Sequence, residues 1–149
     1  MALVGFIGLA LLVGVAGGAA SSAGGRGWYL SLIRPPGTPP DWVFAPVWTV
    51  LYVLMGIAAW RVWRRGARPA LQLWGWQLAL NAMWSPVFFR LHSPAAALAV
   101  ILPLLALIGL TTRAFVRQER LAGALLLPYL GWVCYATYLN AGFWWLNRG

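Results

Sequence analysis

Residues 91–112 read LHSPAAALAVILPLLALIGLTT, a run that contains no Asp, Glu, Lys or Arg. A helix needs about 20 apolar residues to cross the roughly 30 Å hydrocarbon core of a bilayer, so this run predicts one membrane span. Outward from it, four further intervals lack the same four residue types: residues 1–25, 42–60, 69–89 and 121–147. Five membrane-spanning helices would therefore use almost the whole chain.

The composition supports the same fold class. The chain of 149 residues is 62% hydrophobic and 9% charged, whereas a soluble domain carries about 25% charged residues. The first interval has no basic segment before it and is long for a signal peptide, so we expect it to stay as a helix despite its small-residue tail at 19–23. We predict one all-α integral membrane domain over residues 1–149, with helices at about 3–22, 42–63, 69–90, 94–115 and 121–146.

The net charge of +9 comes from 11 arginines that flank the apolar intervals. Arginine at helix ends anchors the helix and meets anionic headgroups, so we expect no nucleic-acid partner. Seven arginines fall on the side that holds the N-terminus and four on the other, which favours a cytoplasmic N-terminus. Arginine without lysine favours a bacterial source, and hence a bacterial cell membrane.

Groups for acid–base or metal chemistry are scarce. The two carboxylates, Asp41 and Glu119, flank predicted helices, and His92 and Cys134 are single. Ion-coupled transport usually needs ionisable groups within the membrane. The sequence therefore predicts no metal site and no required cofactor.

Aromatic and amide side chains recur on one face of three predicted helices, at the spacings of three and four that share a helix face. The helix at 42–63 carries Trp48, Tyr52 and Met55; that at 69–90 carries Gln77, Asn81, Trp84 and Phe88; that at 121–146 carries Tyr129, Trp132, Ala136, Leu139 and Phe143, with Asn140 beside them. Such faces can simply pack against one another. They can equally line a cavity for a flat apolar ligand with a few polar atoms, in which the small Ala136 would leave room.

Two small-residue motifs predict close helix approach or a homodimer contact. They are Gly14-x-x-x-Gly18 and Gly75-x-x-x-Ala79.

Three stretches together resemble the TspO/MBR family, also called the translocator protein or peripheral benzodiazepine receptor family. The first runs from Trp28-Tyr29 to Pro39-Pro40-x-Trp42-Val43-Phe44-x-Pro46-Val47-Trp48-x-x-Leu51-Tyr52; the second is Gln77-Leu78-x-Leu80-Asn81-x-x-Trp84-Ser85-Pro86; the third is Pro128-Tyr129-Leu130-x-Trp132-x-x-Tyr135-Ala136-Thr137-x-Leu139-Asn140. They occur in the family's order, and the resemblance covers essentially the whole chain.

This resemblance implies a five-helix bundle, usually a homodimer, that binds porphyrins such as protoporphyrin IX and haem-type tetrapyrroles, sterols, and benzodiazepine-type ligands. The implied pocket is lined by Trp48, Tyr52, Asn81, Trp84, Trp132, Ala136 and Leu139. Two alternatives remain open: light-dependent porphyrin degradation, with Trp48 and Trp132 as candidate reactive residues, and transport of tetrapyrroles or sterols.

The chain departs from the family pattern in two places. Gly37 stands in the proline-rich connector where many members have a tryptophan, so a lid contact to the ligand is expected to be missing. The sterol-recognition pattern of animal members needs a basic residue shortly after a tyrosine, and none follows Tyr138 until Arg148. Porphyrins are therefore favoured over sterols as ligands.

Overall fold

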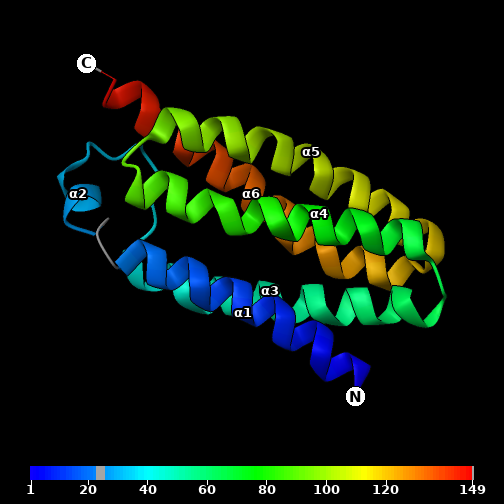
Figure 1. Cartoon of the computed structure of the whole chain (residues 1–149). Coiled ribbons are helices and arrows are strands. Elements are labelled where there is room, and N and C mark those ends of the chain that lie inside the picture. The colour runs from blue at the N-terminus through cyan, green and yellow to red at the C-terminus, as the bar shows by residue number, and fades with distance from the viewer. Residues whose placement is uncertain (23–25, 149) are drawn as a thin grey trace.

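The computed structural model describes residues 1–22 and 26–148, which are almost entirely helical (Figure 1). None of these residues lies in a strand. The helices are α1 (Ala2–Ser22), α2 (Arg26–Ser31), α3 (Asp41–Arg64), α4 (Arg68–Ser85), the π-helical turn η1 (Pro86–Arg90), α5 (Pro94–Gln118) and α6 (Arg120–Leu146). The all-α prediction is confirmed.

Four of the described helices are long and apolar enough to cross a membrane: α1, α3, α5 and α6. The helix expected at 69–90 is divided instead into α4 and η1. Gln72, Gln77 and Asn81 dilute the apolar character of α4, so length and composition do not mark it as a span. These four helices indicate an integral membrane protein. That the segment at 69–90 crosses the membrane as a fifth helix stays a prediction.

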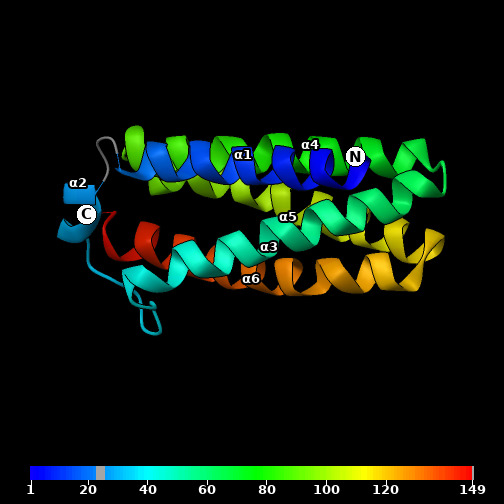
Figure 2. The same ribbon diagram turned by 90° about the horizontal axis from the view of Figure 1, so that it is seen from below.

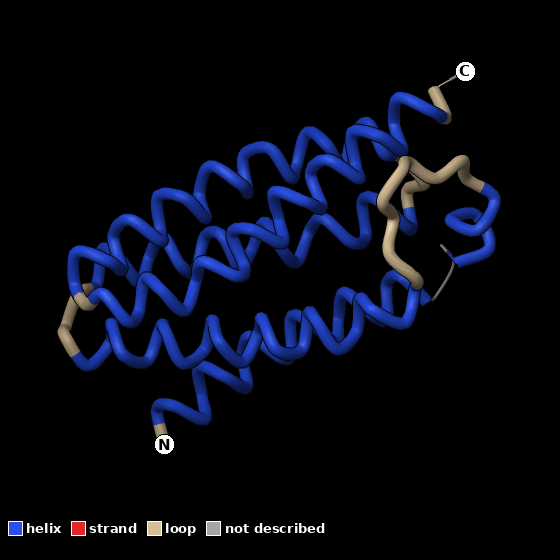
Figure 3. The backbone as a smooth tube through the Cα atoms, turned by 180° about the vertical axis from the view of Figure 1, so that it is seen from behind, coloured by secondary structure: helices blue, strands red, loops and turns tan. Residues whose placement is uncertain are grey.

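The five long helices form a closed ring in which α1 lies beside α3, α3 beside α6, α6 beside α5, α5 beside α4, and α4 beside α1 (Figure 2). The loops gather at the two ends of this bundle (Figure 3). One end holds α2, the proline-rich connector at 32–40, the α4–α5 link and the C-terminus; the other holds the α3–α4 turn and the α5–α6 junction.

Two local features differ from the sequence expectation. The connector after α1 contains a short helix, α2, before its prolines begin. The helix at 69–90 widens into a π turn at Pro86, and the amide of Leu91 bonds the carbonyl of Pro86 at 3.2 Å. Proline has no N–H for the carbonyl one turn earlier, which accounts for the loss of regular α geometry there.

Glycines bring α1 directly against α3. A Cβ on Gly56 would lie 2.5 Å from the Cα of Ile7, and one on Gly14 would lie 2.6 Å from the Tyr52 ring. Gly14 of the first small-residue motif is therefore used inside the bundle. Gly75 of the second motif faces open space, and Ala79 is exposed.

Candidate functional site

Four polar side chains form a hydrogen-bonded chain in the middle of the bundle. The Tyr52 hydroxyl donates to Oδ1 of Asn81 at 2.7 Å, and Nδ2 of Asn81 donates to the Tyr129 hydroxyl at 2.8 Å. The Tyr129 hydroxyl in turn donates to Oε1 of Gln77 at 2.7 Å. All four side chains are buried, and they come from α3, α4 and α6. Each amide and hydroxyl thus finds a partner away from water, which the bilayer interior requires.

Aromatic rings cover the connector side of this network. The Trp48 ring stacks on Tyr52 at 5.5 Å between centroids and meets Tyr129 edge-on at 6.3 Å. It also meets Trp132 edge-on at 6.4 Å and 89°, and the Phe44 ring meets Trp132 edge-on at 5.9 Å and 72°. Flat π surfaces and a polar network are therefore adjacent between α3 and α6.

The indole nitrogen of Trp132 is buried and has no hydrogen-bond acceptor among the described residues. A buried donor without a partner costs about 1–3 kcal/mol. Nε1 of Trp132 is therefore a donor that a ligand carrying an acceptor atom could satisfy.

Trp84 links this region to a second aromatic cluster nearer the connector. Its Nε1 donates to Oδ1 of Asn140 at 2.8 Å, and its ring stacks on Phe88 at 5.3 Å. Nδ2 of Asn140 donates to the Pro94 carbonyl at 2.8 Å, which fixes the start of α5. Leu139 is buried in the second cluster, which also contains Tyr29, Phe88, Ala97 and Phe143.

The proline-rich connector is fastened across this end of the bundle by α6. The Tyr135 hydroxyl donates to the Gly37 carbonyl, and the Tyr138 hydroxyl donates to the Pro36 carbonyl at 2.7 Å. The Asn147 side chain accepts from the Ile33 amide and donates to its carbonyl, both at 2.9 Å. The connector is therefore held by hydrogen bonds between its own backbone and the side chains of α6 and its C-cap residue Asn147.

Gly37 has a φ of 86°, in the left-handed region that favours glycine. A side chain there would strain the turn that presents its carbonyl to Tyr135. The glycine at position 37 thus has a conformational reason.

Of the seven residues expected to line a pocket, Trp48, Tyr52, Asn81 and Trp132 meet directly in the structure. Trp84 and Ala136 pack beside them, and Leu139 lies in the second cluster. Tyr129, in the middle of the network, and Gln77, at its end, are not among those seven residues, although each shares a helix face with some of them. Phe44 and Tyr135 were missed because they flank the faces that periodicity defines.

The two pockets described, of about 390 and 300 Å³, lie at opposite ends of the bundle. The smaller one is lined by Trp28, His92 and Asn147 among others, next to the connector. Neither of these two pockets is lined by Trp48 or Trp132.

The TspO/MBR family model matches residues 6–146. The tryptophan-rich protein TspO of Chlorobaculum tepidum is 42% identical over 139 residues, covering 90% of this chain and 88% of that protein. The tryptophan-rich sensory protein of Cereibacter sphaeroides is 44% identical, covering 76% and 72%. The human translocator protein is 38% identical, covering 84% and 78%.

Proposed function

The chain belongs to the TspO/MBR family, and from this premise we propose that it is a membrane receptor for porphyrin-like tetrapyrroles such as protoporphyrin IX. The proposed site lies between α3, α4 and α6, with the ligand against Trp48, Tyr52, Trp84 and Trp132. Ala136 and Leu139 border it on α6.

The unpartnered Trp132 indole nitrogen beside stacked aromatic rings is the observation that supports this most directly. A porphyrin is a flat aromatic macrocycle with acceptor groups at its edge. Its flat face could stack on one of the Trp48 and Trp132 rings and meet the other edge-on, because the two rings stand at 89° to each other, and an acceptor would complete the hydrogen bonding of Trp132. Asn81 and Tyr52 satisfy each other, so they hold the floor of the site in place.

Tryptophan quenching tests the proposal. Protoporphyrin IX titrated into the purified protein should quench emission saturably. Trp132→Phe combined with Ala136→Phe should weaken apparent affinity by about tenfold or more, because it removes the free donor and fills the space beside it. The matched control is Trp63→Phe, which removes an indole at the far end of α3. Affinity unchanged by the double substitution, or reduced equally by the control, would count against this site.

A second candidate, light-dependent porphyrin degradation, is favoured by one observation: two indoles, Trp48 and Trp132, adjoin at 6.4 Å. An illuminated porphyrin can excite dioxygen, and excited dioxygen can oxidise either the porphyrin or a nearby indole. Under illumination in air, loss of the porphyrin absorption band over many equivalents would support enzymatic turnover. Loss that stops at one equivalent, with oxidised indole in the protein, would leave only sacrificial chemistry.

We also propose that the chain forms a homodimer and that its N-terminus lies on the cytoplasmic side. The exposed Gly75 and Ala79 on α4 support the first proposal, and the excess of arginine at the α3–α4 turn and the α5–α6 junction supports the second. Sterols remain a further ligand class to be tested in the same titration.

A further inference from the structure

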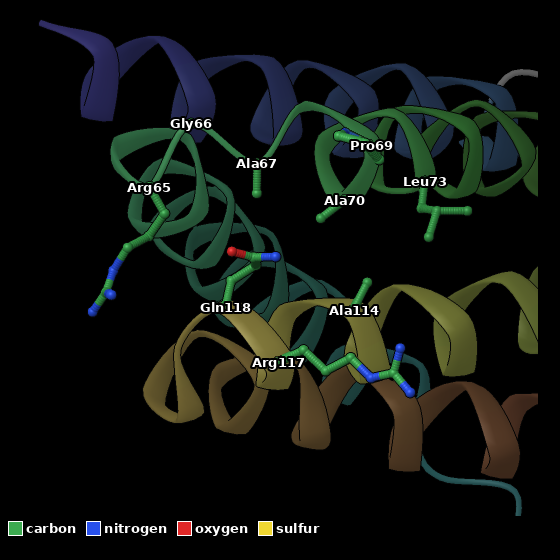
Figure 4. Close-up of a pocket in the computed structure, with 9 residues that line it drawn as sticks. All are labelled: Arg65, Gly66, Ala67, Pro69, Ala70, Leu73, Ala114, Arg117 and Gln118. Atoms are coloured by element: carbon green, nitrogen blue, oxygen red, sulfur yellow. The ribbon is translucent and has the colours of Figure 1, made fainter.

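The larger pocket opens at the end of the bundle opposite the connector, between α4 and α5 (Figure 4). One side is formed by the α3–α4 turn and the first turns of α4, and the other by the last turns of α5. Its volume is about 390 Å³, within the range of small-molecule sites.

Small side chains create this space. Ala67 lines it from the α3–α4 turn, Ala70 from the start of α4, and Ala114 from α5. Because alanine carries only a methyl group, α4 and α5 do not close on each other at this level. Leu73, one turn further along α4, adds an apolar surface that leads from the pocket toward the middle of the bundle.

The polar part of the pocket is cationic. Arg65 and Arg117 line it together with Gln118, and Figure 4 shows Gln118 between the two arginines, below the turn of Gly66 and Ala67. Glu119 binds Arg61 and Arg65, the latter at 3.3 Å. Arg117 forms no ion pair within the described part of the chain, so its guanidinium is the group available to an anion.

This end of the bundle carries a large excess of positive charge. One carboxylate, Glu119, stands against seven arginines, which lie at the end of α3, in the α3–α4 turn, at the start of α4, at the end of α5 and at the start of α6: Arg61, Arg64, Arg65, Arg68, Arg113, Arg117 and Arg120. Such a cluster attracts anions and retains them in a recess better than on a flat surface.

The chemistry favours a phosphate at membrane level. A guanidinium binds phosphate oxygens in a bidentate manner, and a neutral amide adds another donor. The pocket lies where the candidate span α5 ends. Arginines at span ends lie among headgroups, and basic recesses between such helices suit anionic lipid. The alanine and leucine side chains add an apolar surface, which the apolar part of a lipid can contact and which a free ion would not need.

We propose that this pocket binds the headgroup of an anionic phospholipid. Arg117 and Gln118 hold the phosphate, and Ala67, Ala70 and Ala114 enclose the glycerol beneath it. Leu73 contacts the start of an acyl chain. The site is independent of the tetrapyrrole site, which lies on the connector side of the buried polar network.

Native mass spectrometry of the purified full chain tests this with dioleoylphosphatidylglycerol as the probe and dioleoylphosphatidylcholine as the neutral comparison. The anionic lipid should bind at least tenfold more tightly at one site. Arg117→Gln should weaken it about tenfold. Arg120→Gln makes the same charge change at the same end of the bundle without lining the pocket, and should alter affinity by less than twofold. Ala114→Leu should also weaken binding by filling the recess, provided its thermal unfolding matches the unmodified chain.

Three outcomes would overturn the proposal. Equal losses for Arg117→Gln and Arg120→Gln would indicate diffuse attraction and no defined site. Equal affinity for the two lipids would remove the role of charge. Inorganic phosphate that displaces the anionic lipid at equal concentration, and raises the unfolding temperature as much, would assign the site to a free anion. If Ala114→Leu fails to fold, the two arginine variants still decide the matter.

Discussion

At the scale of single residues, the central feature is that Tyr52, Gln77, Asn81 and Tyr129 satisfy one another within the bundle, whereas the buried indole nitrogens of Trp74 and Trp132 have no partner among the described residues. Tyr129 accepts from Asn81 and donates to Gln77, so one hydroxyl completes two amides on α4. An amide without a partner is costly where no water is present. The network is therefore a structural support for the aromatic site and fixes the distance between α4 and α6.

Tyr129→Phe should destabilise the protein by about 1–3 kcal/mol, because it leaves buried amide groups on Asn81 and Gln77 without a partner. The measurement is the thermal unfolding temperature in detergent. Tyr138→Phe is the matched control, since it removes an exposed hydroxyl that bonds the Pro36 carbonyl. Equal, small effects of the two substitutions would mean that the buried network contributes no more than a surface hydrogen bond.

At the scale of elements, close backbone approach holds α1 on the bundle. The long first helix exposes Val4, Leu9, Leu12 and Val15, so much of its surface faces outward. Its attachment depends on the contact of Ile7 with Gly56, and of Gly14 with Tyr52. The Tyr52 hydroxyl also donates to Asn81, so α1 supports the candidate site through its contact with the Tyr52 ring.

Gly56→Ala should destabilise the protein by about 1–3 kcal/mol, because the new methyl group would overlap backbone atoms of Ile7 that cannot rotate away. The comparison is Gly8→Ala, at a position where a Cβ meets nothing within 4 Å. Thermal unfolding of both variants checks this. Gly56→Ala as stable as Gly8→Ala would show that α1 can move aside freely.

Glu119 joins α3 to the α5–α6 junction. The hydrogen bond from Arg61 lowers the pKa of the Glu119 carboxyl below its usual range. A lowered folded-state pKa contributes stability above the unfolded-state value of about 4.3 and loses it as the pH falls through the folded value. The unfolding temperature should therefore fall below about pH 4, and Glu119→Gln should reduce that fall. A fall of the same size in the variant would place the acid sensitivity elsewhere.

At the scale of the whole molecule, the ring of five long helices leaves outward faces that differ in kind. The face of α4 combines the small Gly75 and Ala79 with the exposed Trp76 and Met83. Because small residues allow close helix approach, this face suits a second copy of the chain. On α1, Gly14 already packs against the Tyr52 ring of the same chain, so it cannot contact a second copy.

Gly75→Leu together with Ala79→Leu should convert the proposed dimer to monomer, because the added side chains hold the two α4 helices apart. Light scattering coupled to size exclusion in detergent measures the change. Gly18→Leu, in the α1 motif, should leave the dimer intact. Dimer loss with Gly18→Leu alone would move the contact to α1, and a monomeric unmodified chain would remove the proposal.

The sequence alone determined the helical class, the positions of the long helices and the residues on their inward faces. Charge-free length and a period near 3.6 are local properties, so they can be read without knowing which helices are neighbours. The helix boundaries agree within about three residues at most ends. The exception is residues 86–90. Pro86 removes one hydrogen bond from the helix, and how the turn relaxes after that loss cannot be read from the local sequence.

Only the tertiary structure decided which faces meet. It joined Tyr52, Asn81, Tyr129 and Gln77 into one network, and it assigned Gly14 to internal packing while leaving Gly75 open. It also fastened the connector to α6 through the carbonyls of Pro36 and Gly37. Each of these contacts joins residues that are at least 29 positions apart in the sequence. Such pairings follow from the packing of all five long helices together, which no local pattern in the chain encodes.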